Sequence, residues 1–249
     1  TKKRIVKDRM NMPCLFEFVY FSRPDSSIDS ISVHKSRLRM GDFLGEKILA
    51  EYPNLNVDVV IPIPDTSRTS AMQVAHKLGV KYREGFMKNR YIGRTFIMPG
   101  QKTRKQSVKQ KLNPIEIEFA NKRVLLVDDS IVRGHTSKKI VQMVKKCSAK
   151  KVFFASASPP IRYQNIYGID MPATSELIAH NKSIADIKKY IKADELIYQD
   201  LEDLKRSATI GNPKITEFED SVFTGKYRVG NITADYLNNL EQSRSELSK

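Results

Sequence analysis

The sequence has no tryptophan, two cysteines, and only 11 glycines and 11 prolines among 249 residues. Cys14 and Cys147 cannot form a disulfide framework, and with four histidines they cannot supply the ligands of zinc ribbons or four-thiolate iron–sulfur clusters. So few glycines and prolines exclude collagen-like and linker-like compositions. No apolar run reaches the roughly 18 residues that a transmembrane helix requires, so the pattern predicts a soluble chain.

Acidic residues are also scarce relative to basic ones. The sequence has 28 aspartates and glutamates and 43 lysines and arginines, which gives a formal charge of +15. Such a surplus favours polyanionic partners, nucleic acid among them. The surplus is uneven, since residues 81–111 contain ten basic residues and one acidic residue and so account for +9 of the +15. We therefore expect this one segment to dominate the electric field of the protein.

The beginning of the chain gives little sign of targeting. Residues 1–8 are charged and no long apolar run follows them, so no secretory signal is predicted. The low cysteine content fits a reducing compartment, and we expect a cytoplasmic protein. Because the first residue is Thr1 rather than methionine, the chain is interpreted as a processed product or a piece of something longer.

Strand-like and helix-like segments alternate, which indicates an α/β fold built from βαβ units around a mostly parallel sheet. Strands are expected at 57–63, 80–83, 124–127, 151–157 and 195–198. Helices are expected at 68–78, from Thr136 or Ser137 to Lys146, at 183–191, at 200–206 and, as a polar tail, at 231–246. Residues 97–114 are predicted to form a long exposed loop.

The most informative stretch is V-L-L-V-D-D-S-I-V-R-G-H-T-S, residues 124–137. A buried strand delivers Asp128 and Asp129 to the carboxyl end of the sheet, where open α/β folds bind ligands. Gly134 follows in a turn, and Thr136 and Ser137 begin a helix whose N–H groups and dipole suit a phosphate. Carboxylates beside a phosphate site make chemical sense if they bind the hydroxyls of a phosphorylated sugar, with Mg²⁺ balancing the charge.

A bare pair of aspartates in a turn more commonly only caps a helix, but here strand, acidic pair, glycine, hydroxyls and helix follow in register. The stretch resembles the phosphoribosyl pyrophosphate (PRPP) motif of type I phosphoribosyltransferases. The resemblance implies that family's fold, with Asp128 and Asp129 bonding the ribose hydroxyls. It also implies a loop that holds the 5-phosphate, with the residues Ser130, Arg133, Gly134, His135, Thr136 and Ser137.

A second turn, Asp65 to Ser67, follows the strand at 57–63. Thr66 and Ser67 can offer hydroxyls and backbone N–H groups to a pyrophosphate and its metal, although the same residues also make an ordinary turn and helix cap. Opposite the acidic pair, this turn resembles the family's pyrophosphate loop. We therefore expect Asp65, Thr66 and Ser67 to contact PRPP, and Thr66, Asp128 and Asp129 to hold Mg²⁺.

Three longer stretches, 14–26, 86–101 and 167–180, resemble the glutamine PRPP amidotransferases, and the likeness extends from about residue 5 to 230. The resemblance implies the displacement of pyrophosphate from PRPP by ammonia to give 5-phosphoribosylamine, the committed step of purine biosynthesis. Because the C1–O bond breaks toward an oxocarbenium-like sugar, this chemistry needs a neutralised leaving group and little water. A phosphoribosyltransferase domain is thus expected over 1–230, with a helical tail over 231–249.

The basic segment, residues 81–111, can neutralise the negative charge of the departing pyrophosphate. The resemblance implies a catalytic loop that closes over PRPP, with the residues Lys88, Arg90, Tyr91 and Arg94, although a solvated loop would have the same composition. Tyr20 and Ile97 match positions that line the route of ammonia in the family, and each could equally be a core residue. Lys88 also matches a position linked to feedback by purine nucleotides.

The sequence departs from the family at three points. His135 stands where these enzymes usually have threonine, and it is interpreted as a solvent-facing loop residue whose backbone N–H still binds phosphate. The cysteines are too few for the iron–sulfur cluster of some members, so no cluster is expected. We expect the family's amino-terminal glutaminase domain to be absent, and we do not expect Thr1 to replace its cysteine nucleophile. We therefore expect a half-enzyme that uses free ammonia, in a homo-oligomer that is a tetramer by resemblance.

Two other functions remain open. A phosphoribosyltransferase for a nucleobase would share residues 124–137 but would need a hood that recognises the base, and the stretches at 14–26 and 86–101 disfavour it. A non-catalytic binder of PRPP or nucleic acid is supported mainly by the charge of +15, and would show binding with a steep salt dependence without pyrophosphate release.

Overall fold

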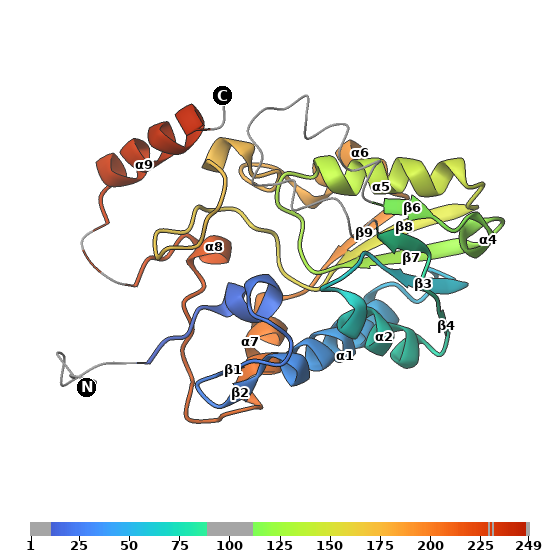
Figure 1. The fold of residues 1–249 in the computed structure, drawn as a ribbon, viewed down its shortest axis with the longest axis horizontal. Helices are drawn as coiled ribbons and strands as arrows, with labels where there is room; N and C mark the ends of the chain where they lie inside the picture. Colours follow the sequence, from blue (N-terminus) through green and yellow to red (C-terminus); the bar gives the residue numbers. More distant parts are fainter. Residues whose placement is uncertain (1–10, 89–111, 229, 231, 248–249) are drawn as a thin grey trace.

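The computed structural model describes residues 11–88, 112–228, 230 and 232–247 (Figure 1). The strands are β1 (Ser27–Ile28), β2 (Ile31–Ser32), β3 (Val59–Pro62), β4 (Lys81–Tyr82), β5 (Phe86–Lys88), β6 (Leu112–Pro114), β7 (Arg123–Asp128), β8 (Lys151–Ser156) and β9 (Glu195–Tyr198). The helices are α1 (Val33–Glu51), α2 (Arg68–Leu78), α4 (Glu116–Phe119), α5 (His135–Lys146), α6 (Ile184–Ile191), α7 (Leu201–Thr209), α8 (Ser221–Thr224) and α9 (Ala234–Leu247). Two short turns, the π-helical η1 (Glu17–Phe21) and the 3₁₀ turn η2 (Thr174–Glu176), complete the described elements.

One parallel sheet forms the centre of the molecule, with the described strands in the order β4-β3-β7-β8-β9. Its register sets Pro62 of β3 beside Val127 of β7, and Val127 beside Ala155 of β8. The apolar residues of β7, at 124–127, are all fully buried, as expected for a strand that is covered on both faces. The predicted α/β class and mostly parallel sheet are confirmed.

Helices cover the two faces of the sheet unequally (Figure 1). One face packs against α1, α2 and α7 in the larger apolar core, which includes Leu44, Val74 and Leu204. The other face packs against α5 and α6 through Ile140 and Ile187. The helices predicted at 68–78, 183–191 and 200–206 are confirmed as α2, α6 and α7, with ends that differ by at most three residues.

Helix α1 was not expected from the sequence, although it is 19 residues long. Its buried side carries apolar residues at 33, 40, 44 and 48, but Ser36, Arg37, Gly41 and Gly45 interrupt this stripe. The glycines are needed for close packing against α2, because a Cβ atom on Gly41 would lie 2.3 Å from the carbonyl oxygen of Ser70. A buried side that mixes apolar with small and polar residues gives a weak amphipathic signal.

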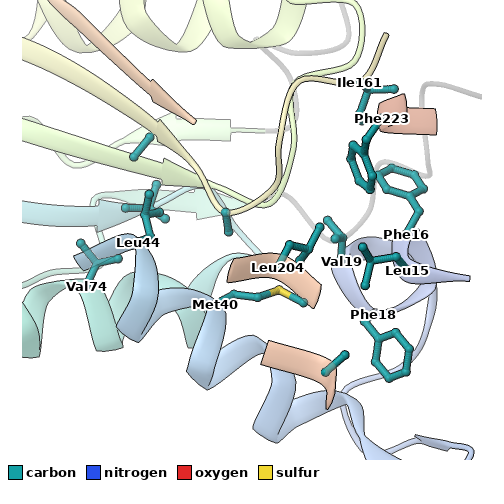
Figure 2. Packing of buried hydrophobic residues seen from close by; sticks show 14 of the residues in the cluster. Leu15, Phe16, Phe18, Val19, Met40, Leu44, Val74, Ile161, Leu204 and Phe223 are labelled. Carbon is teal, nitrogen blue, oxygen red and sulfur yellow. The ribbon is translucent and has the colours of Figure 1, made fainter. Parts of the chain in front are cut away.

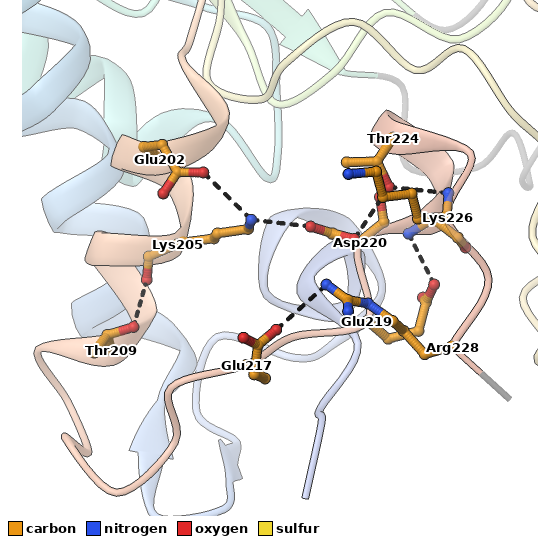
Figure 3. A network of polar contacts seen from close by, with 10 residues as sticks. Glu202, Lys205, Thr209, Glu217, Glu219, Asp220, Thr224, Lys226 and Arg228 are labelled. Carbon is orange, nitrogen blue, oxygen red and sulfur yellow. Dashed lines mark hydrogen bonds and ion pairs between the residues drawn. The ribbon is translucent and has the colours of Figure 1, made fainter. Parts of the chain in front are cut away.

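The segments at 14–22 and 217–228 lie together although they are far apart in the sequence. Aromatic rings join them: Phe16 packs edge-on against Phe223 (Figure 2), and Phe18 packs edge-on against Phe218. Lys205 of α7 ties the same region down by an ion pair of 3.0 Å to the buried carboxylate of Asp220, at the start of α8 (Figure 3). These contacts make the two segments one continuous part of the core.

Two peripheral elements refine the sequence-based expectations. The end of the predicted loop at 97–114 is wrong, because residues 112–114 form β6, which pairs with β5 and buries Leu112. The helical tail is present as α9, whose Arg244 donates a hydrogen bond of 2.8 Å to the carbonyl oxygen of Asn165. Among the helices of the described residues, none is long and apolar enough to cross a membrane.

Candidate functional site

The candidate site lies between β3 and β7, where the order in which strands are added to the sheet reverses its direction. After β3 the chain passes through α2 to β4 at one edge of the sheet, whereas after β7 it passes through α5 to β8 on the other side. The helices therefore leave the two adjacent strands toward opposite faces, which opens a crevice at the carboxyl ends of parallel strands. The N–H of Ile63 bonds the carbonyl of Val127 at 2.8 Å, so the two turns that follow start side by side.

The first turn carries Asp65, Thr66 and Ser67 between β3 and α2. The carboxylate of Asp65 is exposed and forms ion pairs with Lys88 and, at 3.4 Å, with Arg68. The structure thus brings Lys88, predicted for the pyrophosphate side of the site, to the predicted pyrophosphate turn. Asp65 holds these cations at the turn, and its contact with PRPP stays a prediction.

Thr66 and Ser67 differ in what they can offer. Thr66 faces the acidic pair: burial raises the pKa of Asp129, and a hydrogen bond from the Thr66 hydroxyl opposes part of this rise. Ser67 is fully buried, and its hydroxyl donates to the carbonyl of Ile63. We therefore revise the expectation for Ser67, whose hydroxyl is used inside the turn and leaves the backbone as its remaining donor.

The second turn presents the acidic pair at the end of β7. Burial raises the pKa of Asp128 well above the usual range, and the charge of Asp129 raises it further. Burial also raises the pKa of Asp129, against hydrogen bonds from Ser130 and the charge of Arg37. The side chain of Asp128 accepts the N–H of Asp129 at 2.9 Å, and that of Asp129 accepts the Ser130 hydroxyl at 2.7 Å. Two carboxylates held this way gain from hydroxyl donors or a cation in front of them.

The residues present fit a magnesium ion that arrives with its substrate. Within the described residues, no group of three or more histidine, cysteine or acidic side chains could hold a metal by itself. Mg²⁺ commonly binds through one or two carboxylates plus phosphate oxygens and water. Asp128, Asp129 and the hydroxyl of Thr66 offer that partial oxygen set, so the predicted ligands remain the best candidates.

The phosphate turn ends at Gly134, which caps α5. This corrects the expected cap at Thr136 or Ser137, because the helix begins at His135. Gly134 has a φ of 72°, and a Cβ atom there would lie 2.2 Å from Cδ1 of Ile178. Only glycine fits both the left-handed backbone and this close approach. The first turn of α5 therefore points its backbone N–H groups into the crevice from a rigid start.

The side chains around this turn differ in burial and in their partners. Thr136 is exposed and Ser137 is buried, so Thr136 is the hydroxyl better placed for a ligand. The guanidinium of Arg133 pairs with Glu176 of η2, and both line a cavity of about 270 Å³. The expectation that His135 lies in a loop is wrong, because it opens α5, but it is exposed as expected, and its ring bonds the hydroxyl of Tyr190 at 2.6 Å.

The remaining predicted residues fall on two parts of the chain. Tyr20 lies in η1, half-buried, with its ring 5.1 Å from that of Phe21 and packed against the larger core. Arg90, Tyr91, Arg94 and Ile97 lie outside the described residues. Their proposed tasks remain predictions from the resemblance. Cys14 and Cys147 pack in the two different core layers, on opposite sides of the sheet.

Two arginines near the site were missed by sequence reasoning. Arg37 is buried in α1, only 4% exposed, and its charge acts on Asp129. Arg68 opens α2 and pairs with both Asp65 and Glu84. A charged residue on the buried side of a helix is a usable signal, but it requires the helix itself to be recognised first.

Comparisons with known proteins point to the same family as the two turns. The phosphoribosyl transferase domain family matches residues 27–168. The chain is 60% identical over 237 residues to an amidophosphoribosyltransferase of Pseudomonas aeruginosa and 54% identical over 237 residues to that of Escherichia coli. Each alignment covers 95% of this chain and 47% of the relative, so the chain spans about half the length of the curated relatives it matches.

A solved structure shows the same architecture. The glutamine PRPP amidotransferase of Bacillus subtilis, complexed with ADP and GMP, superposes with a TM-score of 0.79 at 38% identity, covering 93% of this chain and 50% of that one. With the family match over more than half of its length, the chain belongs to the phosphoribosyltransferase family, as a homologue of part of the amidophosphoribosyltransferases.

Proposed function

We propose that the chain catalyses the displacement of pyrophosphate from PRPP by ammonia, giving 5-phosphoribosylamine for purine biosynthesis. The observation that carries the proposal is the meeting of the acidic pair, the Asp65 turn and Lys88 at one edge of the sheet, in a chain 60% identical to an amidophosphoribosyltransferase. That relative is about twice as long as this chain. We therefore propose for this chain only the transfer of ammonia to PRPP, and not the release of ammonia from glutamine.

Each part of the substrate has a counterpart in the site. The carboxylates of Asp128 and Asp129 accept hydrogen bonds from the ribose hydroxyls, and the N-terminal turn of α5 holds the 5-phosphate. Lys88, together with Arg90 and Arg94 as implied by the resemblance, neutralises the pyrophosphate. Tyr91 belongs to the same proposed loop, and Tyr20 and Ile97 are proposed for the route of ammonia.

The reaction breaks the C1–O bond and forms a C1–N bond. The bonding electrons leave with the pyrophosphate, the nitrogen lone pair attacks C1, and the nitrogen then loses a proton to the departing pyrophosphate or to water as the amine forms. Mg²⁺ bound with PRPP would supply additional positive charge at the leaving group. Because the transition state places positive charge on the sugar, the site requires ordered charge and excluded water more than a strong base.

Several finer statements belong to the same proposal. We propose that ammonia, rather than glutamine, is the nitrogen source for this chain by itself, and that a glutaminase domain or chain would supply it from glutamine. We also propose a cytoplasmic location and a homo-oligomer, a tetramer by resemblance. Regulation by purine nucleotides is supported by the relative from B. subtilis, which was solved with ADP and GMP. The absence of an iron–sulfur cluster and of nucleic acid binding remain predictions.

A steady-state assay tests the function. Pyrophosphate release is measured with PRPP and Mg²⁺, with ammonium chloride or glutamine as the nitrogen donor, and with hypoxanthine, guanine or orotate as alternative acceptors. We expect turnover with ammonium alone. Turnover with a nucleobase would favour the nucleobase transferase, and turnover with glutamine would contradict the half-enzyme.

The acidic pair provides the matched variant. Asp128→Asn combined with Asp129→Asn is expected to lower kcat/KM for PRPP by at least about 10³-fold, since the sugar loses both acceptors that are charged. Far-UV circular dichroism should remain unchanged. Glu202→Gln, an exposed acid on α7, serves as a control with unchanged kinetics. If the double variant keeps its activity, the assignment of the sugar site is wrong.

A further inference from the structure

Arg37 is a buried cation that joins three elements around the candidate site. Its guanidinium donates from Nε to the carbonyl oxygen of Phe18 at 2.9 Å and from Nη2 to that of Ser22 at 2.8 Å. Phe18 lies near the beginning of η1, and Ser22 directly follows it. One side chain of α1 therefore holds both ends of the turn that carries Tyr20.

The backbone of Arg37 connects to the pyrophosphate side of the site. Its carbonyl oxygen accepts the hydroxyl of Ser70 at 2.9 Å, and Ser70 lies in the first turn of α2, just after Thr66. The close packing at Gly41, one turn further along α1, fixes the two helices against each other. Phe18 and Val19 of η1 and Met40 of α1 belong to the same buried apolar cluster (Figure 2).

The charge of Arg37 has a counterpart in the acidic pair. Burial lowers the pKa of Arg37, and the negative charge of Asp129 acts in the opposite direction. No ion pair of Arg37 with a carboxylate is formed within the described residues, and its hydrogen bonds go to carbonyl groups. A buried charge without a paired carboxylate lowers the stability of the fold, and a neutral side chain could fill the same space. We therefore expect this charge to serve the site.

We propose that Arg37 is a positioning residue that holds η1 against α1 and α2 and places a positive charge that acts on Asp129, so that the acceptor side and the sugar side of the site stay aligned. This inference rests on the proposed function, since it assigns the two sides to ammonia and to PRPP. Arg37 is only 4% exposed, so we place it behind the site and not against either substrate. The guanidinium has two separable properties: its fork of N–H groups holds η1, and its charge acts on Asp129.

Two substitutions separate these parts, and a third is the matched control. Arg37→Gln removes the charge and cannot span both carbonyls, so the KM values for ammonia and for PRPP should each rise about tenfold. Arg37→Lys keeps the charge but presents one nitrogen, so the KM for ammonia should stay raised while the KM for PRPP returns to within about threefold of wild type. Arg39→Gln, two residues along α1, removes a guanidinium that bonds the carbonyl of Ser207 on α7, and should leave both KM values unchanged.

A purely structural arginine predicts a different pattern. General loosening lowers the fraction of active protein, so kcat falls in Arg37→Gln and in Arg37→Lys while both KM values stay constant; this result would overturn the proposal. An equal response of Arg39→Gln would do the same. If Arg37→Gln does not fold, the split between the two KM values in Arg37→Lys decides. Wild-type protein without any turnover of PRPP and ammonium would instead contradict the proposed function.

A spectroscopic measurement tests the inference without turnover. The chain has no tryptophan, so Phe21→Trp places a single reporter at the end of η1, where Phe21 is 38% exposed. In this background, Arg37→Gln should shift the emission to longer wavelength as η1 loosens, whereas Arg39→Gln should not. Identical emission in the two variants contradicts the proposed hold on η1.

Discussion

At the scale of single residues, the candidate site depends on groups whose environments work against the stability of the protein. Burial raises the pKa of both Asp128 and Asp129, and the charge of Asp129 raises that of Asp128 further, so ionising them in the native state is unfavourable. Gly134 holds a left-handed backbone against Ile178. Such positions are expected where a ligand supplies the missing interactions, and they allow two predictions.

The first concerns the acidic pair in protein freed of metal by chelation. A raised pKa means that the native state binds more protons than the unfolded state between the unfolded and the folded pKa, so stability falls as pH rises through that window. Asp128→Asn keeps an oxygen to accept the N–H of Asp129 and removes this penalty. We expect the variant to melt about 2–4 °C higher than wild type at pH 8. The two should melt together near pH 3, and a lower melting temperature for the variant at pH 8 would show that the pair stabilises the fold.

The second prediction separates backbone strain from steric contact at Gly134. Gly134→Ala should lower the free energy of unfolding by about 2–4 kcal/mol, because it combines a left-handed alanine with a clash. Gly79→Ala is the control, since Gly79 has a φ of 65° with nothing near its missing Cβ atom, and should cost about 1 kcal/mol. Adding Ile178→Val to Gly134→Ala removes the contacting Cδ1 and should restore part of the loss in urea denaturation. Equal losses at the two glycines would contradict the steric account.

At the scale of elements, the sequence pattern was sufficient where apolar residues carry the packing. The strands β3, β7, β8 and β9 and the helices α2, α6 and α7 were predicted because buried strands are runs of apolar residues and these helices show apolar residues on one face. Helix α1 and the turn η1 were not predicted; in α1, glycines and Arg37 interrupt the apolar residues of the buried side and weaken the pattern. The same reason explains the candidate site: the motif residues were found, whereas Arg37 and Arg68, which position other residues, were not.

The link between α7 and α8 shows how one element depends on a buried charge. Lys205 pairs with Asp220, whose side chain is 2% exposed, and also with Glu202, whose side chain is 80% exposed. Lys205→Met should cost about 2–4 kcal/mol in free energy of unfolding, because it leaves a buried carboxylate without its partner. Glu202→Gln breaks the exposed pair with the same cation and should cost less than about 0.5 kcal/mol.

Chemical denaturation of the single variants and of Lys205→Met combined with Asp220→Asn checks this prediction. Removing the buried charge as well should recover part of the loss, since the uncompensated carboxylate causes it. Additive losses in the double variant would mean that the two side chains contribute independently. In that case packing of the lysine stem, rather than the ion pair, would hold α8 in place.

At the scale of the whole molecule, the topology and the charge act on the same ligand class. The two turns after β3 and β7 meet at the carboxyl ends of these strands, and the excess of positive charge lies mainly in the segment 81–111, whose Lys88 pairs with Asp65 of the first turn. Such a field increases the local concentration of a polyphosphate and acts on encounter more than on chemistry. A nucleic acid binder would instead spread its positive charge along an extended surface.

These alternatives differ in their response to salt and to the location of the charge. Salt shortens the range of electrostatic attraction to about 10 Å at 0.1 M ionic strength, so the KM for PRPP should rise several-fold from about 0.05 to 0.5 M potassium chloride while kcat changes little. Two triple variants remove the same charge: one changes Lys102, Arg104 and Lys105 to glutamine, and the other changes the exposed Lys35, Lys189 and Lys214. Only the first should raise the KM at low salt and flatten its salt dependence. Equal effects of both would mean that the total charge of +15 attracts the substrate, and the concentration of basic residues at 81–111 would then have no special part in binding it.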